Sequence, residues 1–94
     1  MKRKIDVLRV IVFEEGLENA KMFVAQCLEK DICVQGRDLK ELFKRLNATI
    51  YLELPYMGTI SPAPDKFLGM WEEGEVLAHE KFLEAPIEAR QLTA

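Results

Sequence analysis

The feature that most constrains the fold is a set of apolar residues with helical spacing near the middle of the chain. They fall on one face of an α-helix and are Leu39, Leu42, Phe43, Leu46 and Ile50. Asp38 can cap the first turn, and Glu41 stands where a capping box reaches back. We expect the helix to run to about Leu54, because Pro55 lacks an N–H group and restricts the residue before it. Such a helix needs a partner layer for its apolar face.

Three segments before this helix have the composition of β-strands. They cover residues 5–13, 21–28 and 32–35. Residues 14–20 are predicted to form a polar connection, and residues 29–31 a short turn. We therefore expect a three-stranded antiparallel sheet with one face covered by the helix.

The turn centred on Lys30 lies between the two cysteines of the chain and decides whether they face each other. In a tight hairpin, Cys27 and Cys33 would lie directly opposite each other, which makes a disulfide or a two-ligand metal site conceivable. Zinc would need two more ligands, and the only histidine, His79, lies in a different segment. We expect instead that both thiols are reduced and pack as small apolar groups beneath the helix.

The part of the chain after Pro55 has weaker signals. Residues 56–64 contain glycine and proline and predict a loop. A short second helix is expected next, with an apolar stripe of Phe67, Met70 and Trp71, a cap at Asp65 or Ala63 and a stop at Gly74. Residues 87–92 alternate in polarity and could return as a fourth, edge strand.

The predicted fold class is therefore α+β, with the order β-β-β-α, a short second helix and a possible fourth strand. A chain of 94 residues, 49% apolar and 31% charged, is long enough for one globular domain. We expect residues 1–54 to form its core and residues 55–94 an extension packed on the same domain.

Charge and hydropathy exclude some function classes. The net charge is −3 and the pI about 5.2, whereas dedicated nucleic-acid binders are usually basic, so direct nucleic-acid binding is not expected. No apolar run approaches the ~18 residues of a membrane span. The apolar stretch 7–13 contains Arg9 and runs into acids, unlike a signal peptide. We expect a cytoplasmic protein.

The residues offer no recognisable catalytic constellation. His79 lies among charged residues, without a nucleophile to activate. The adjacent acids Glu14-Glu15 and Glu72-Glu73 do not converge, and Asp6 is a lone acid on the first predicted strand. We therefore expect no catalytic, cofactor-binding or metal-binding residues, and no enzyme activity.

An interaction surface is the remaining expectation. Aromatic and methionine side chains near the second helix are candidates for it, namely Tyr56, Phe67, Met70 and Trp71. The alternative for Trp71 is a place in the core, which is the usual one for a tryptophan in a small domain.

The segment Phe23–Leu39, FVAQCLEKDICVQGRDL, followed by a helix that closes with Tyr51-Leu52-Glu53, resembles the core of the HicB-like antitoxin family. The resemblance covers about residues 7–54, half of the chain. It implies a partial, catalytically inactive ribonuclease-H-like fold with a β-β-β-α-β core. It also implies a domain that binds and neutralises a small RNA-cleaving HicA toxin, often as a dimer or higher oligomer.

Many members of that family also carry a C-terminal helix-turn-helix or ribbon-helix-helix domain. The residues after Pro55 lack two well-patterned helices and are net acidic, so we see no DNA-reading module there. Two hypotheses follow. The first is a HicB-like antitoxin that binds a toxin. The alternative is a solitary homo-oligomeric domain of the same fold, with a structural or ligand-binding role and pairing through an exposed sheet edge.

Overall fold

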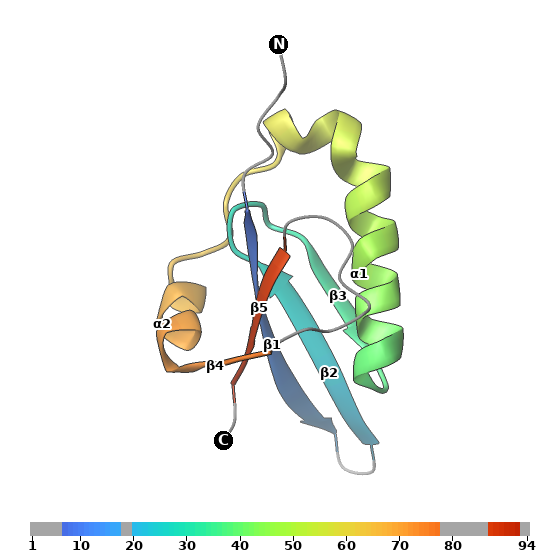
Figure 1. Ribbon diagram of the computed structural model, residues 1–94, viewed down its shortest axis with the longest axis vertical. Helices are drawn as coiled ribbons and strands as arrows, with labels where there is room; N and C mark the ends of the chain where they lie inside the picture. Colours follow the sequence, from blue (N-terminus) through green and yellow to red (C-terminus); the bar gives the residue numbers. More distant parts are fainter. Residues whose placement is uncertain (1–6, 18–19, 78–86, 93–94) are drawn as a thin grey trace.

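The computed structural model describes residues 7–17, 20–77 and 87–92 of the 94-residue chain. Within this part the fold is α+β, with a five-stranded mixed sheet in the order β3-β2-β1-β5-β4 (Figure 1). The strands are β1 (Leu8–Leu17), β2 (Ala20–Cys27), β3 (Cys33–Gly36), β4 (Glu75–Val76) and β5 (Ile87–Gln91). The helices are α1 (Leu39–Glu53), the 3-10 helix η1 (Leu54–Thr59) and α2 (Lys66–Glu73).

The predicted meander of β1, β2 and β3 is present and antiparallel. The segment expected as an edge strand, β5, instead lies inside the sheet: it pairs in parallel with β1 and, on its other side, antiparallel with β4. β4 has only two residues, too few for a periodic pattern to reveal it. The predicted sheet of three or four strands therefore has fewer strands than the observed sheet of five.

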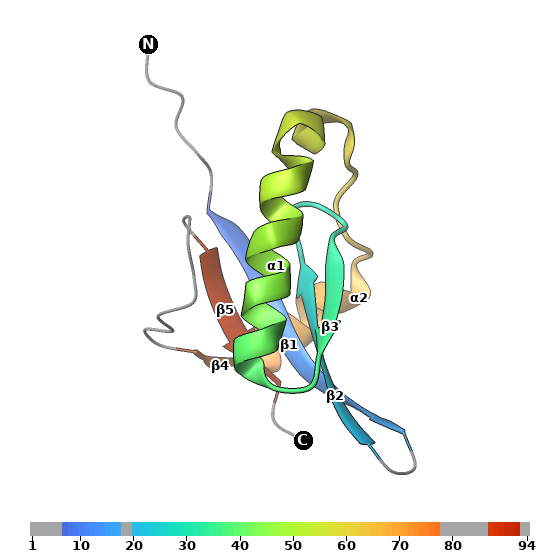
Figure 2. The same ribbon diagram turned by 90° about the vertical axis from the view of Figure 1, so that its right-hand side faces the viewer.

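The residues expected to connect the first two strands belong to the strands themselves. β1 continues to Leu17 and β2 begins at Ala20, so that Glu14 pairs with Phe23 and Glu15 with Met22. Glu14, Glu15 and Gly16 are exposed, because this end of the hairpin extends beyond the helices (Figure 2). A strand segment without a buried face has no hydrophobic signal, which explains the error.

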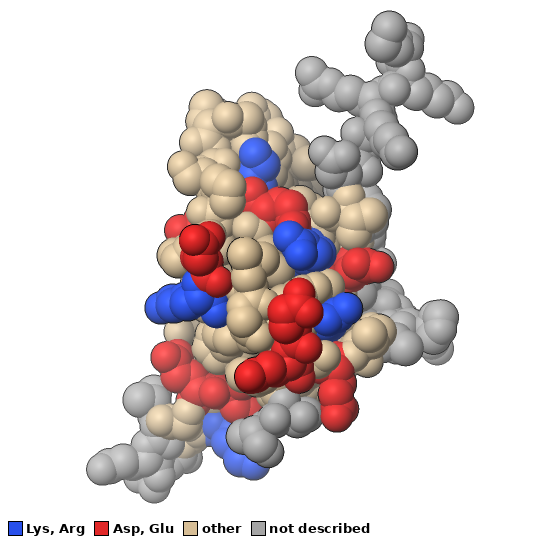
Figure 3. Space-filling model, turned by 90° about the vertical axis from the view of Figure 1, so that its left-hand side faces the viewer, with Lys and Arg blue, Asp and Glu red and all other residues tan. Residues whose placement is uncertain are grey.

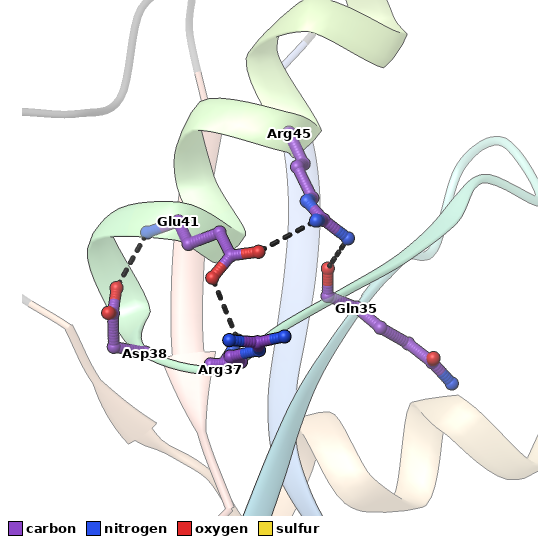
Figure 4. A network of polar contacts seen from close by, with 5 residues as sticks. All are labelled: Gln35, Arg37, Asp38, Glu41 and Arg45. Carbon is purple, nitrogen blue, oxygen red and sulfur yellow. Dashed lines mark hydrogen bonds and ion pairs between the residues drawn. The ribbon is translucent and has the colours of Figure 1, made fainter.

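Helix α1 begins as predicted. The Asp38 carboxylate accepts a hydrogen bond from the Glu41 N–H at 2.8 Å, which satisfies one of the free donors of the first turn. The Glu41 carboxylate reaches back to the Arg37 N–H at 3.4 Å and forms an ion pair with Arg45 at 2.7 Å (Figure 4). This cap sets where the chain leaves β3 and turns over the sheet.

Helix α1 ends at Glu53, within one residue of the expected end, but the segment after it differs from the expectation. Pro55 does not start a loop, because the chain continues from Leu54 to Thr59 as the 3-10 helix η1. Proline is tolerated in the first turn of a helical segment, where its missing N–H would have no partner in any case. The later loop ends at Asp65, and α2 runs as predicted to its cap at Gly74.

The main core lies between α1 and one face of the sheet (Figure 2). Leu42, Phe43, Leu46 and Ile50 are buried there, which confirms the predicted helix face. They pack with alternate strand residues, including Val10, Val12, Ala25, Cys27 and Ala89.

A second, smaller core covers the opposite face. Ile11 and Leu28 are buried there against Trp71 of α2, with Phe67, Met70 and Leu92 packed around them. The expectation that one sheet face is covered was therefore incomplete, since α2 forms a layer of its own (Figure 1). It is this second layer that brings α2 next to β1 and β5.

The expectation that Cys27 and Cys33 face each other is wrong. Cys33 pairs with Gln26, and the Cys27 N–H bonds to the Ile32 carbonyl at 2.9 Å. This register differs by one residue from the expected hairpin, and such a shift turns the side chain to the other sheet face. Cys27 is buried beneath α1 as predicted, whereas Cys33 is exposed, and both are free thiols.

Candidate interaction surfaces

Two arginine side chains from neighbouring strands lie over the ring of Trp71. The Arg90 guanidinium carbon is 4.3 Å from the ring centroid and that of Arg9 is 5.7 Å away. Arg90 also donates a hydrogen bond from Nη1 to the Trp71 carbonyl oxygen at 2.9 Å. Cations over the face of an indole are attracted by the ring quadrupole. These contacts fasten α2 to β5 and β1.

Arg9 is itself held in place by Glu29. The Glu29 carboxylate accepts from the Arg9 backbone N–H and from Arg9 Nε, both at 2.6 Å. One carboxylate thereby joins the β1 backbone, the Arg9 side chain and the turn after β2. Because its Nε is engaged with Glu29, Arg9 adds little positive charge to this side of the molecule.

Acidic side chains surround α2. Asp65 precedes the helix, Glu72 and Glu73 end it, and Glu75 follows at the start of β4; all four are exposed. Lys66 is the only cation between residues 65 and 75. Figure 3 shows several acidic side chains on this side of the molecule, with Lys and Arg side chains interspersed among them. We call Asp65, Glu72, Glu73 and Glu75 the acidic α2 surface.

The candidate interface residues do not form one surface. Phe67, Met70 and Trp71 lie together on α2, but Phe67 and Met70 are half-buried and Trp71 is only 6% exposed. Phe67 also stacks on Phe13, with 6.4 Å between ring centroids. Tyr56 lies apart from them on η1 and is 62% exposed. The structure thus gives the three α2 residues a packing role and leaves Tyr56 on the surface.

A second exposed surface lies where α1 passes into η1. Tyr51, Leu52, Leu54 and Tyr56 are all more than half exposed there. Tyr51 and Leu52 lie off the apolar face of α1, at 75% and 69% exposure. The helical spacing from Leu39 to Ile50 already places Tyr51 and Leu52 off the apolar face, although neither was among the candidate interface residues.

The two thiols show no sign of activation. Burial is the main cause that raises the pKa of Cys27, and the charge of Glu29 adds to it. Partial burial likewise raises the pKa of Cys33, followed by the charges of Asp31 and Glu15. Activated cysteines have a lowered pKa, so the environment of both thiols favours the unreactive protonated form.

Among residues 7–17, 20–77 and 87–92, no group of three or more His, Cys, Asp or Glu side chains is arranged to hold a metal ion. Asp6 and His79, considered above as a strand acid and as a histidine in a charged segment, lie outside the described residues.

Comparison of the chain with protein-family models, curated proteins and solved structures finds no match. No helix in the described part of the chain has the length and apolar character needed to cross a membrane.

Proposed function

We propose that this chain is a HicB-like, non-catalytic interaction domain, the antitoxin of a toxin–antitoxin pair, and that it binds a small, basic, RNA-cleaving protein. The observation that carries the proposal is the connectivity of the sheet. Three antiparallel strands are followed by α1, and the chain then returns in β5 parallel to β1. This is the β-β-β-α-β order that the resemblance of residues 7–54 implies for a partial ribonuclease-H-like fold.

The acidic α2 surface supports the charge of the proposed partner. Proteins that bind RNA are usually basic, because they neutralise phosphates with lysine and arginine. Exposed carboxylates at Asp65, Glu72, Glu73 and Glu75 would attract such a protein and speed its association. Binding over these carboxylates would cover the basic surface that the partner needs for RNA, so inhibition requires no catalysis by this chain.

The proposed binding depends on charge and is therefore sensitive to salt. Exposed charges are screened over about 8 Å at physiological ionic strength and about 3 Å at 1 M salt. The contacts of Trp71 with Arg90 and Arg9 hold the α2 backbone against the sheet, which lowers the ordering cost of association at this helix.

The proposal is tested by capturing partners of the affinity-tagged chain from its native host, with and without nuclease treatment. We expect a small basic protein in stoichiometric amount, unaffected by nuclease and released at high salt. Light scattering of the eluate gives the mass of the complex. A companion that disappears after nuclease treatment would mean that nucleic acid joins the two, and would contradict the proposal.

A second candidate is a solitary homo-oligomeric domain of the same fold. The open edge of β3 favours it, because an unpaired strand edge can accept another strand. A pure homo-oligomer without any companion in the capture experiment would support this candidate over the antitoxin.

A further inference from the structure

A small cavity opens beside the start of α2, where the loop after η1 passes the turn that follows β2. It has a volume of about 300 Å³, and the apolar part of its lining consists of Leu28, Pro62, Ala63, Pro64 and Leu68. Leu28 is buried, whereas Leu68 is 43% exposed. Leu68 is thus an apolar side chain of α2 that the fold leaves partly open to solvent at this cavity.

The loop that forms one wall of the cavity is fixed to the turn after β2. The Ala63 N–H donates to the Leu28 carbonyl oxygen at 3.0 Å, and the Asp31 N–H donates to the Ser61 carbonyl oxygen at 2.7 Å. The prolines on either side of Ala63 have fixed φ angles, which restricts the loop further. The wall is therefore formed before a ligand arrives, and this lowers the ordering cost of binding.

Three charged side chains, Arg9, Glu29 and Asp65, complete the lining. Arg9 donates from Nε to Glu29 and lies over the ring of Trp71, so its charge is already engaged. Each Glu29 oxygen accepts one bond from Arg9 and keeps a further lone pair. Asp65 makes no side-chain bond to α2, and neither ion pair within residues 7–17, 20–77 and 87–92 involves it. The lining therefore has an excess of one negative charge.

The start of α2 offers little to an anion, although helix N-termini often bind anions. The N–H groups of Phe67 and Leu68 already donate to the carbonyl oxygens of Pro64 and Asp65. The Asp65 and Glu29 carboxylates would also repel a negative group. The lining therefore suits a ligand with an apolar stem and a positive end.

We propose that this cavity binds a lysine side chain of the small basic partner; the inference rests on the proposed function, which supplies that partner. The aliphatic stem of the lysine lies against Leu28 and Leu68, and its ammonium donates to Asp65 and to the free lone pairs of Glu29. A compact ammonium with three donors can bond carboxylates on separate elements, whereas the planar fork of arginine matches one carboxylate. Asp65 also belongs to the acidic α2 surface, so a partner held there can place a lysine in the cavity.

The first test needs no partner. Nα-acetyl-lysine methylamide is titrated into the ¹⁵N-labelled chain, and amide shifts are followed by nuclear magnetic resonance. We expect saturable shifts at Leu28, Ala63 and Leu68. Nα-acetyl-norleucine methylamide has a similar stem without the ammonium and should bind about fivefold more weakly, as the loss of one exposed ion pair implies. Absence of saturable shifts at the cavity with the lysine probe, or equal binding of both probes, overturns the proposal.

A pair of variants separates the cavity from the general attraction of an acidic protein for cations. Asp65→Asn removes the charge that has no bond to α2, so the fold should be retained, as circular dichroism can check. We expect it to weaken the lysine probe about fivefold. Glu14→Gln removes the same charge from the exposed end of the β1–β2 hairpin and should leave binding unchanged. Equal weakening by both variants contradicts a site at the cavity.

The outcomes distinguish this site from the proposed function. Capture of a basic protein without binding of the lysine probe overturns the cavity site alone, whereas probe binding without any captured protein overturns the proposed function and the source of the lysine. Where both succeed, a Leu68→Ser bait should release the captured protein at lower salt than the wild-type bait, because the stem of the lysine loses its apolar contact. Release of the protein at the same salt concentration from both baits contradicts the insertion of a partner's lysine.

Discussion

Arg90 of β5 lies over the ring of Trp71 in α2 and donates a hydrogen bond to the carbonyl oxygen of the same residue. One side chain thus holds both the face of the indole and the end of the helix backbone. Trp71 is the only fully buried residue of α2, and the half-buried Phe67 and Met70 pack beside it. The position of the acidic α2 surface therefore depends on a strand more than fifteen residues further along the chain.

Replacing Arg90 should loosen this attachment. Arg90→Ala loses the cation–π contact and one hydrogen bond, and we expect the free energy of unfolding to fall by about 1–2 kcal/mol. Urea unfolding followed by the fluorescence of Trp71, the only tryptophan, measures the change. Lys44→Ala on the exposed side of α1 is the control and should change stability little. Equal stabilities for the two variants would contradict the assigned role of Arg90.

At Gly36, the last residue of β3, the chain passes close to the first turns of α1. A Cβ atom there would lie 2.7 Å from the Leu42 backbone nitrogen, and backbone cannot move aside cheaply. We expect Gly36→Ala to destabilise the fold by about 1–3 kcal/mol. Gly69→Ala in α2 is the matched control, because nothing lies within 4 Å of its Cβ position and alanine favours a helix by up to ~1 kcal/mol. In thermal unfolding, the midpoint temperature should fall for Gly36→Ala and rise for Gly69→Ala.

The two aspartates that precede helices should differ in importance. Asp38 accepts a hydrogen bond from the first turn of α1, whereas Asp65 makes no side-chain cap bond to α2. We expect Asp38→Ala to cost about 1 kcal/mol of stability and Asp65→Ala much less. Chemical denaturation of both variants measures this, and an equal loss would show that the cap of α1 contributes nothing beyond the charge.

The buried thiol of Cys27 should make the folded chain less stable at alkaline pH. Burial raises the pKa of Cys27 in the folded chain above the ordinary value of 9.0, so the folded state holds this proton more tightly than the unfolded state. The contribution is complete below pH 9.0 and is lost as the pH rises through the folded pKa. Urea unfolding between pH 7 and pH 11 should show this decline, and it should be smaller in Cys27→Ala. An equal decline in the variant would assign the effect to other groups.

The elements that could be predicted from the sequence are those with local signals. The apolar spacing from Leu39 to Ile50, the cap at Asp38 and the stop at Gly74 each act within a few residues, and the structure has all three. β1 and β2 were located by their apolar centres, while their exposed ends at Glu14 and Ala20 carry no such pattern.

Features that depend on contacts between residues far apart in the sequence could not be predicted from local patterns. β5 pairs with β1 across more than seventy positions, and this pairing brings Arg90 and Leu92 next to α2. A difference of one residue in the β2–β3 register decides on which face of the sheet Cys33 lies. The length of the turn does not determine this register. The acids near α2 were visible as the pair Glu72-Glu73, but their grouping with Asp65 and Glu75 required the fold.

The most direct measurement of partner binding compares three baits in the native host lysate. They are the wild-type chain, the double variant Glu72→Lys/Glu73→Lys, and the control Glu14→Lys/Glu15→Lys, which changes the net charge equally at the exposed end of the β1–β2 hairpin. We expect wild type and control to retain the same small basic protein in stoichiometric amount, and the α2 variant to lose it. Retention by all three baits, or the absence of any such protein from the wild-type bait, would contradict the proposed function of the acidic α2 surface.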